Sequence, residues 1–559
     1  MTTSAQRRMP KYIFISGGVI SGLGKGIASA SIGMILKQRG LSVSFVKCDP
    51  YLNVDAGTMN PIEHGEVFVT NDGYEMDMDA GHYERFLDQP VQRYSGITSG
   101  QIYLKVIMNE RSLKYHGECV DPVPYLVGEI IKRIKDASTQ SNADIMLIEL
   151  GGTVGEYQNE IYYEAERRMK REFDGDLMHI HLVYLPIPQS VGEMKSKPAQ
   201  QSVRLLNNLG IFPDIILARA MQGLDKRRLS KIAIACGIQE NEVFSAVDVS
   251  SIYAVPVNFE DQKLTDAILA KFNIEKPAWD PTAWQSLLYN IEHNTEEVRI
   301  GIVGKYIMTG DYNLEDAYVS VVESIKHAAW QTGKKAVIDW INAEDLIIDI
   351  KSLEKLDGII VPGGFGERGV EGKVLAAKYA REHGIPYLGL CYGMQIAVIE
   401  FARDVCGMEN ANTTEIDNKT PYPVIHVMPE QEKKLLAQDY GGTMRLGKWD
   451  CRLKKGSIVY KAYGSKEIVS ERHRHRYECN NEYIAILKKN GLTVSGTSLD
   501  GKLVEIIELP KKIHPFFVGV QFHPEFTSRP LRPQPLFKEF IMQASKRRAK
   551  ENQIKLNNI

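Results

Sequence analysis

The chain has 559 residues, a net charge of -2 at pH 7, and 43% hydrophobic and 25% charged residues. This length exceeds what one hydrophobic core holds, so we expect a globular protein of two to four domains. The near-zero charge argues against a nucleic-acid partner, and no segment approaches the roughly 18 consecutive apolar residues of a membrane helix. Seven dispersed cysteines without a Cys-x-x-Cys pair and no signal-peptide pattern favour the reducing cytoplasm.

The first element predicts a phosphate-binding loop. Residues 12–28, YIFISGGVISGLGKGIA, read as an apolar strand, a glycine-rich turn and a helix that opens at Lys25. Such a loop directs backbone N–H groups and the positive helix end at one point, which suits a phosphate. The spacing departs from the usual loop, because five residues separate Gly18 from Gly24 and Gly26 replaces the Ser or Thr that holds Mg²⁺. Carboxylates elsewhere must then supply the metal ligands, unless the glycines form only a tight turn.

Two further strands predict the other charged groups of this site. The strand LSVSFVKCD ends near Lys47, which would join Lys25 because the C-terminal ends of parallel strands meet at one edge. The strand ADIMLIEL ends in Glu149, and the long stretch 50–101 carries Asp79. We expect Asp79 and Glu149 to bind Mg²⁺, which prefers carboxylate oxygen. A solvated loop acid is the alternative for Asp79.

The strands HIHLVYLPI and DIILARA complete a doubly wound parallel α/β domain. After the first of them, GEMKSKPAQQS brings Lys195, Lys197 and Gln200 together, which suits a phosphate or a base edge; a charged surface loop is the alternative. A proline- and tryptophan-rich stretch then predicts a partly helical linker, and a new α/β series starts at VRIGIVGKY. The expected organisation is a first domain of residues 1–272, a linker of residues 273–297 and a second domain of residues 298–559.

The second half carries a pattern for acyl transfer. PYLGLCYGMQ places Cys391 between Gly389 and Gly393 in a strand-to-helix turn, where the positive helix end favours the thiolate. QFHPEF delivers His523 and Glu525, which we read as alternate residues of an extended strand, so that Glu525 can orient His523. The run VPGGFG would offer backbone N–H groups to an oxyanion. Although a lone buried cysteine is usually structural, this set predicts a nucleophilic triad.

Together these motifs resemble known families. PGGFG, GLCYGMQ and QFHPEF are similar to class I glutamine amidotransferases, and GGVISGLGKG, DMDAGHYERF, IELGGTVG, KSKPAQQS, ENANTTE and ERHRHRYE resemble the CTP synthase family, over nearly the whole chain. The resemblance implies two doubly wound, mainly parallel α/β domains, a P-loop NTPase-like amidoligase and an amidotransferase. It implies ATP-dependent amination of UTP to CTP through a 4-phosphorylated intermediate, with ammonia from L-glutamine. Mg²⁺ as cofactor, GTP as allosteric activator, CTP as inhibitor and a homotetramer are implied as well.

The alternatives are another P-loop amidoligase that amidates a carboxylate, an ATPase with an idle amidase domain, and a filament-forming scaffold. The last two would leave a complete triad or a complete phosphate loop unused. The run ERHRHRYE could be an exposed charged face, or one of its guanidinium groups could hold a substrate carboxylate.

The resemblance also implies roles for individual residues. The catalytic groups would be Cys391, His523, Glu525, Lys25 and Lys47, and the metal ligands Asp79 and Glu149. The ATP contacts would be Gly22, Leu23, Gly24, Lys25, Gly26, Ile27, Asp79, Val247, Asp248 and Val249. The UTP and CTP contacts would be Ser21, Glu156, Tyr157, Gln158, Lys195, Ser196, Lys197, Pro198, Ala199, Gln200 and Lys231. The glutamine contacts would be Gly364, Tyr392, Gly393, Met394, Gln395, Glu415 and Arg476, and the GTP lid would be the loop from Arg368 to Gly372.

One departure from the family concerns the pyrimidine site. After GGTVG the family shows an Asp and, two residues later, a Glu, whereas this chain has Glu156 and Gln158. The pair thereby loses one charge and gains one methylene of reach. The strength of CTP inhibition is the property that this exchange puts in question; the reaction itself does not depend on the pair.

Overall fold

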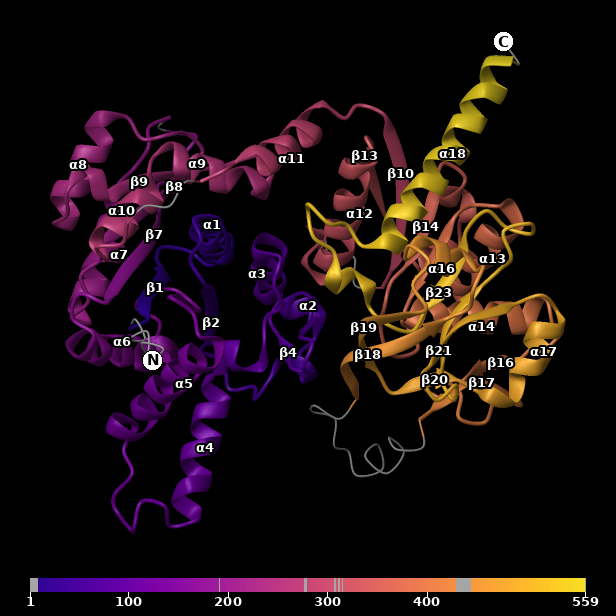
Figure 1. Cartoon of the computed structure of the whole chain (residues 1–559), viewed down its shortest axis with the longest axis horizontal. Coiled ribbons are helices and arrows are strands. Elements are labelled where there is room, and N and C mark those ends of the chain that lie inside the picture. The colour runs from indigo at the N-terminus through magenta and orange to yellow at the C-terminus, as the bar shows by residue number, and fades with distance from the viewer. Residues whose placement is uncertain are drawn as a thin grey trace, which may run out of the picture. The chain divides into compact units, whose positions relative to one another are not determined.

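The computed structural model describes residues 9–190, 192–275, 279–305, 308–309, 312–313, 315–428 and 444–557 (Figure 1). The chain forms two compact units. The first comprises residues 1–55 and 82–282, and the second residues 56–81 and 283–559. Residues 273–297, the expected linker, contain the boundary near residue 282, while residues 56–81 of the front half pack with the second unit.

The first unit contains a seven-stranded sheet in the order β5-β2-β6-β1-β7-β8-β9, and every neighbouring pair is parallel. Its strands are β1 (Lys11–Gly17), β2 (Val43–Asp49), β5 (Gly96–Thr98), β6 (Ile145–Leu150), β7 (Leu177–Tyr184), β8 (Ile215–Ala220) and β9 (Val243–Val247). Nearly all their residues are buried, because both faces of such a sheet are covered. The predicted doubly wound sheet is confirmed.

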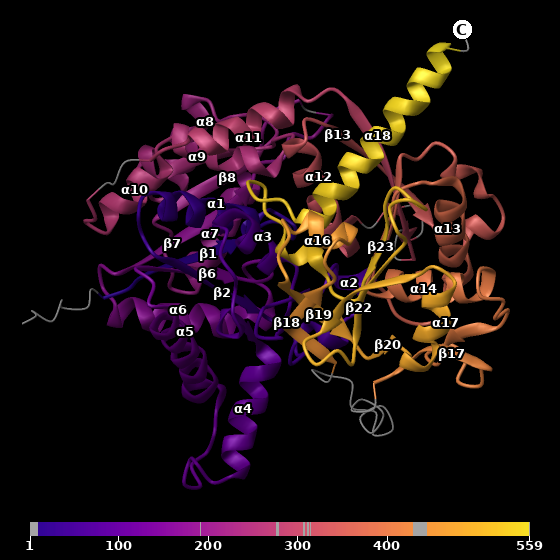
Figure 2. The ribbon, with the colours of Figure 1, turned by 45° about the vertical axis from the view of Figure 1, so that its right-hand side comes forward.

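Helices cover both faces of this sheet, with α1 on one side and α5 and α6 on the other (Figure 2). Tyr12 and Phe14 of β1 join the apolar cluster under α5 and α6, whereas Phe45 of β2 touches Gly33 of α1. The helices are α1 (Lys25–Gln38), α3 (Asp79–Leu87), α4 (Ser99–Arg111), α5 (Val127–Ser141), α6 (Glu160–Glu172), α7 (Lys197–Asn208), α8 (Lys226–Cys236), α9 (Val255–Asp261) and α10 (Leu264–Lys271). Helix α1 begins at Lys25 as predicted, and α3 forms within a stretch whose sequence shows little helical periodicity.

The second unit contains a nine-stranded sheet in the order β13-β10-β14-β15-β23-β22-β21-β18-β19. The first five strands are parallel to their neighbours and the remaining pairs are antiparallel. These strands are β10 (Glu297–Gly304), β13 (Lys335–Asn342), β14 (Gly358–Val361), β15 (Tyr387–Leu390), β18 (Arg445–Leu453), β19 (Ile468–His475), β21 (Thr493–Ser498), β22 (Val504–Glu508) and β23 (Phe517–Val520). The result is an α/β unit with a mixed sheet, in which four neighbouring pairs are parallel and four are antiparallel.

Helices and short strands surround this second sheet. The helices are α11 (Thr282–His293), α12 (Val319–Gln331), α13 (Val370–His383), α14 (Tyr392–Asp404), α16 (Ile458–Ala462), α17 (Ile484–Lys489) and α18 (Pro535–Asn557). The short strands are β11 (Met308–Thr309), β12 (Tyr312–Asn313), β16 (Ala411–Thr413), β17 (Tyr422–Val427) and β20 (Tyr477–Cys479). Within the described residues, no helix is both long enough and apolar enough to cross a membrane.

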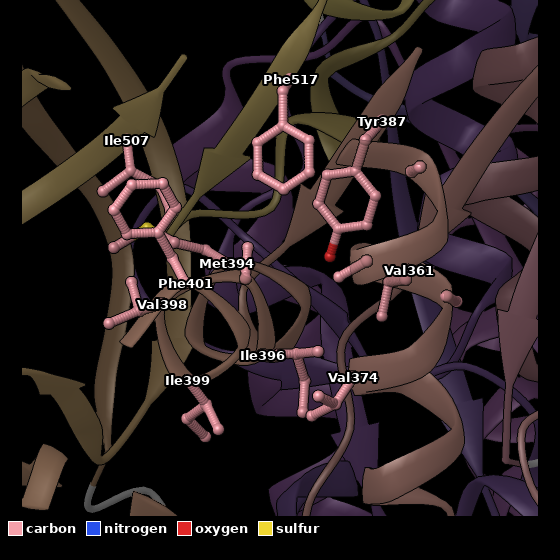
Figure 3. Packing of buried hydrophobic residues seen from close by; sticks show 14 of the residues in the cluster. Val361, Val374, Tyr387, Met394, Ile396, Val398, Ile399, Phe401, Ile507 and Phe517 are labelled. Carbon is pink, nitrogen blue, oxygen red and sulfur yellow. The ribbon is translucent and has the colours of Figure 1, made fainter. Parts of the chain in front are cut away.

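The core beneath the predicted elbow is dense and apolar (Figure 3). Tyr387 of β15 and Phe517 of β23 stack with ring centroids 4.6 Å apart. Met394 and Ile396 of α14 pack against the same cluster and are fully buried. Close-packed protein interiors have low compressibility, so this packing holds the turn between β15 and α14 in a fixed conformation.

Residues 56–81 are tied into the second unit by two buried arginines of β19. They comprise a short 3-10 helix (Ala56–Thr58), α2 (Pro61–His64), β3 (Phe68–Val69) and β4 (Glu75–Met76). Arg474 Nε lies 2.8 Å from Glu75 Oε1, and Arg472 Nε donates to Asn71 Oδ1 at 2.7 Å. The run ERHRHRYE is therefore largely a buried strand, and the reading as an exposed charged face is wrong.

Candidate active sites

The glycine loop follows β1 in the first unit as predicted. Gly22 and Gly24 have positive φ angles of 67° and 91°, a backbone conformation that residues with a side chain rarely adopt. Lys25 is the first residue of α1. Lys25 Nζ donates to the Gly152 carbonyl at 2.7 Å, and the Gly18 N–H donates to the Leu182 carbonyl at 3.0 Å. The loop is therefore held by the ends of neighbouring parallel strands, where α/β proteins bind ligands.

Arg219, at the end of β8, joins two segments that the sequence assigned to ATP. Its Nη1 donates to the Leu23 carbonyl of the glycine loop at 2.7 Å, and its Nε lies 3.0 Å from Asp248 Oδ1. Asp248 also donates its backbone N–H to the Ala220 carbonyl at 3.0 Å. Sequence reasoning missed Arg219, although its place at the end of the strand DIILARA was a usable signal.

Lys47 and Glu149 meet inside the first unit. Lys47 Nζ lies 2.9 Å from Glu149 Oε1, and the Tyr83 hydroxyl donates to the other oxygen of this buried carboxylate. Asp79 is the first residue of α3, and its N–H donates to Asp77 Oδ1 at 3.2 Å. No group of three or more His, Cys, Asp or Glu residues is placed to hold a metal in the parts of the chain that the structure describes. Glu149 in the first unit and Asp79, which belongs to residues 56–81 of the second unit, each offer the carboxylate oxygens that Mg²⁺ prefers.

The residues assigned to the pyrimidine nucleotide lie in four segments: Ser21, residues 156–158, residues 195–200 and Lys231. Helix α7 begins at Lys197, and Gln200 Nε2 donates to Ser196 Oγ at 3.1 Å. Lys195 Nζ lies 2.8 Å from Glu193 Oε2 and lowers the pKa of that carboxyl, with smaller contributions from the charges of Arg228 and Lys231 on α8.

In residues 156–158, Gln158 Nε2 donates to Glu156 Oε2 at 3.0 Å, and Tyr157 is 88% exposed. Of the other residues assigned to the two nucleotides, Ser21 and Val249 are exposed, Gly26 and Ala199 are buried, and Ile27, Pro198 and Val247 are half-buried.

A buried chain of hydrogen bonds runs beneath the glycine loop. It links Glu166 Oε1 to His179 Nδ1 at 2.6 Å, and His179 Nε2 to Ser16 Oγ, Ser16 Oγ to His181 Nδ1, and His181 Nε2 to Ser202 Oγ at 2.7 Å each. With Glu166 as the acceptor at one end, the two imidazoles and the two hydroxyls can each donate once towards it, so that all four links are satisfied together.

The outer end of this chain supports the glycine loop. A Cβ on Gly18 would lie 1.5 Å from Ser202 Oγ, so the hydroxyl occupies the space that a side chain there would need. Burial is the main cause that lowers the pKa of His181 well below its usual value, consistent with a neutral ring. Sequence reasoning missed this network, because its members are scattered over two strands and two helices.

Cys391 occupies the predicted elbow between β15 and α14. It is buried and has φ 51°, in the region that few side chains adopt. A Cβ on Gly389 would lie 2.6 Å from the Gly393 carbonyl carbon, so both glycines are needed for the strand to pass the helix. The Tyr387 hydroxyl donates to the Gly393 carbonyl at 2.8 Å and secures the turn. The predicted elbow is confirmed.

His523 and Glu525 are paired, but their local structure differs from the expectation. Strand β23 ends at Val520, and the pair flanks the start of a 3-10 helix (Pro524–Thr527). The turn, rather than strand alternation, brings His523 Nδ1 within 2.7 Å of Glu525 Oε1. Burial by itself lowers the pKa of His523, but the charges of Glu525 and the Cys391 thiolate outweigh it and raise that pKa to about 10.

A pocket in the second unit is lined by Cys391, His523 and the predicted donor loop. A Cβ on Gly363 would lie 2.9 Å from His523 Cε1, so only glycine allows this approach. Glu66 and Val67 of residues 56–81 line the same pocket. Sequence reasoning did not place any front-half residue there, because a segment some 300 residues away leaves no local signal.

Several residues expected to contact glutamine gather beside this pocket. Glu415 Oε1 accepts from the Gly366 N–H at 2.7 Å. Burial raises the pKa of Glu415, against the opposing effects of the Gly366 amide and the charges of Lys305 and Arg476. Lys305 Nζ also lies 5.8 Å from the centre of the Tyr392 ring. Glu415 therefore carries its carboxylate where the charges of Lys305 and Arg476 act on it.

Two of the expected residues point elsewhere. The Met394 side chain lies in the apolar core (Figure 3). Gln395 donates from Nε2 to the Tyr477 carbonyl at 2.9 Å and to Gln521 Oε1 at 3.3 Å. Any contact of these two residues with a substrate would therefore use the main chain.

The loop that was expected to form a lid, Arg368 to Gly372, is shorter than the sequence indicated. The loop that carries Arg368 ends at Gly369, and Gly372 lies in the first turn of α13. A Cβ on Gly372 would meet the Ala343 carbonyl oxygen at 1.6 Å, so this glycine allows the helix to pack closely. Arg368 is half exposed, and its guanidinium lies 3.4 Å from Glu344.

Comparison with known proteins matches both halves of the chain. The family CTP synthase N-terminus matches residues 11–274, and glutamine amidotransferase class-I matches residues 313–543. A CTP synthase of Geobacillus kaustophilus is 47% identical over 538 residues, which cover 95% of this chain and 99% of that protein. A CTP synthase of Bacillus velezensis is 48% identical over 538 residues, covering 95% and 98%.

Among solved structures, the glutaminase domain of Trypanosoma brucei CTPS with bound acivicin is 39% identical. It covers 44% of this chain and 94% of that chain, with a TM-score of 0.41. Because the relatives match over almost their whole length and both family matches fall in the expected halves, the chain belongs to the CTP synthase family.

Proposed function

We propose that this protein converts UTP to CTP, using ATP and ammonia that it releases from L-glutamine. The observation that carries the proposal is the complete Cys391–His523–Glu525 set on a strained elbow, in a chain that also carries a glycine loop ending at Lys25. Membership of the CTP synthase family selects UTP over the carboxylate substrates of other amidoligases.

In the first unit, the γ-phosphoryl group of ATP would pass to O4 of UTP. The N–H groups of the glycine loop and Lys25 would hold the phosphates, and Lys47 would offset part of the developing charge. Bound Mg²⁺ would neutralise phosphate charge, with Asp79 and Glu149 as its proposed ligands. Ammonia then attacks C4, and inorganic phosphate leaves with the former O4.

In the second unit, the Cys391 thiolate would attack the side-chain carbonyl of glutamine. His523 protonates the leaving ammonia, and the product is a γ-glutamyl thioester. His523 then takes a proton from water, which attacks the thioester and releases glutamate. Glu525 holds the ring by its Nδ1–H, and Nε2 makes no hydrogen bond to any described residue, so it is available to the reacting groups.

We further propose that the protein acts as a homotetramer in the cytoplasm, activated by GTP near Arg368. Support for an assembly comes from α4, where Leu104, Ile107 and Met108 are 49%, 53% and 59% exposed. Such a row of exposed apolar side chains on one helix is typical of a covered surface. All seven cysteines are free thiols, which agrees with a reducing compartment.

The test is CTP formation from UTP, ATP and Mg²⁺, followed by absorbance, with either glutamine or an ammonium salt as the nitrogen source. Cys391→Ala should abolish the glutamine-dependent reaction and retain the ammonia-dependent one, because only the first needs the thiol. Loss of both would refute the division of labour between the two units. Glutamine hydrolysis without any amination of UTP would favour another amidoligase.

A further inference from the structure

A buried glutamine that the triad does not include touches the nucleophile. Gln521 follows β23, is fully buried, and its Nε2 donates to Cys391 Sγ at 3.7 Å. Its main chain is also fixed, since the Gln521 N–H donates to the Glu505 carbonyl at 2.8 Å. The amide therefore stands beside the sulfur on a rigid strand end.

The orientation of this amide follows from its neighbours. The Tyr477 carbonyl can only accept, so the Gln395 amide must turn its nitrogen towards that carbonyl, 2.9 Å away. The same nitrogen lies 3.3 Å from Gln521 Oε1, which must then be the acceptor. The nitrogen of Gln521 consequently faces the sulfur. A flipped Gln521 would set two donors against each other, so two amides in series determine which group Cys391 meets.

The contacts of the sulfur differ between its two protonation states. As a thiol, Cys391 donates to the Arg474 carbonyl at 3.7 Å and accepts from Gln521. Once the proton has moved to His523, the contact with Arg474 loses its hydrogen. The Gln521 N–H remains and becomes a hydrogen bond to an anion, which is stronger than one to a neutral group.

We propose that Gln521 is a catalytic residue of the glutamine-hydrolysing site, whose amide N–H stabilises the Cys391 thiolate. Gln395 and the Tyr477 carbonyl act as positioning groups that hold the amide in this orientation. The inference rests on the proposed function for its substrate, but its effect on the thiolate can be measured without any substrate.

Three variants separate hydrogen bonding from packing. Gln521→Glu keeps the shape and the acceptor for Gln395 but replaces the N–H by negative charge, whereas Gln521→Leu and Gln521→Met remove the polar group. Gln543→Leu is the matched control, since Gln543 is also buried but donates to Glu539 on α18. Thermal unfolding and ammonia-dependent CTP formation report whether each variant is folded.

The first readout is the rate of alkylation by iodoacetamide against pH, compared with Cys391→Ala to isolate this thiol. Removing one hydrogen bond to an anion should move the midpoint of the profile up by about one pH unit in Gln521→Leu, and further in Gln521→Glu. The second is glutamine hydrolysis, which should fall by roughly tenfold to a hundredfold in Gln521→Leu. The control should change neither.

The inference is overturned if the folded variants retain the wild-type midpoint, or if Gln521→Glu alkylates like the wild type. Equal losses of glutamine-dependent and ammonia-dependent activity would also contradict it, because they indicate a structural role. If the wild type makes no CTP at all, the proposed function fails, while the alkylation profile still decides the role of Gln521.

Discussion

The side chain of Lys373, on α13, is a basic group buried in the interior of the second unit. It is fully buried, and its Nζ makes no hydrogen bond within the described part of the chain. Its Nζ lies 5.4 Å from the centre of the Tyr392 ring. Burial, and to a smaller extent the like charge of Lys305, lower the pKa of Lys373 from 10.5 to about 7, against an opposing effect of Cys391.

We predict that Lys373→Met stabilises the second unit at neutral and mildly acidic pH. A tenfold change in a protonation equilibrium corresponds to about 1.4 kcal/mol, so the displaced pKa implies an upper bound of about 5 kcal/mol for holding this ammonium inside. Local relaxation reduces such costs, and we expect a gain of about 2–4 kcal/mol for a buried apolar side chain of similar length.

This gain should depend on pH in one direction only. Below pH about 7 the lysine is protonated in both folded and unfolded states, so its full cost is present. Between about 7 and 10.5 the folded protein has lost the proton while the unfolded chain keeps it, so the unfolded state binds more protons and wild-type stability rises with pH. The advantage of Lys373→Met should therefore shrink across this range.

Thermal unfolding of wild type and variant at a series of pH values measures this difference, and the subtraction cancels groups common to both proteins. The midpoint should differ by roughly 5 °C or more near neutral pH and converge towards pH 10. The control is Lys378→Met on the same helix, whose exposed ammonium lies 2.6 Å from Asp404 and should change the midpoint little. A variant that is less stable at every pH, or whose gain is independent of pH, would refute the reasoning.

Three other perturbations test the remaining features. Ser202→Ala removes the donor to His181 Nε2 and leaves a buried acceptor unpaired, so it should lower the free energy of unfolding by about 1–3 kcal/mol; an unchanged denaturation midpoint would contradict this. Arg474→Leu leaves the Glu75 carboxylate buried without its cation, and we expect a loss of about 3–5 kcal/mol in chemical denaturation. A double variant with Glu75→Leu should recover much of that loss, and no recovery would argue against the ion pair. Arg219→Ala releases the glycine loop, so it should raise the KM for ATP about tenfold while glutamine hydrolysis at saturating glutamine stays unchanged, and equal loss of both activities would count against it.

Features with a strong local signal could be predicted from the sequence. The glycines before Lys25 predict a turn with positive φ, and α1 starts at that lysine. Gly389 and Gly393 likewise predict the elbow around Cys391, because only small residues let a helix start so close to its strand. In both places the backbone geometry is a property of a few consecutive residues.

Predictions of secondary structure for short segments of a few residues were less accurate. His523 and Glu525 meet as expected, yet through a 3-10 turn, because β23 ends before them. Helix α3 forms where the sequence shows little periodicity. Local patterns do not record where a sheet ends or which neighbours bury a short helix.

The motifs along the chain were enough to predict the two chemistries: the phosphate loop at Lys25 and the thiol, imidazole and carboxylate of the triad. The groups that complete them, such as Arg219 beside the loop and Gln521 beside the sulfur, became visible only in the folded protein. Gln521 lies 130 residues from Cys391 along the chain, and Arg219 lies 196 residues from Leu23. Parallel sheets bring strand ends from distant parts of a sequence to one edge, and no pattern along the chain encodes which distant side chains meet there.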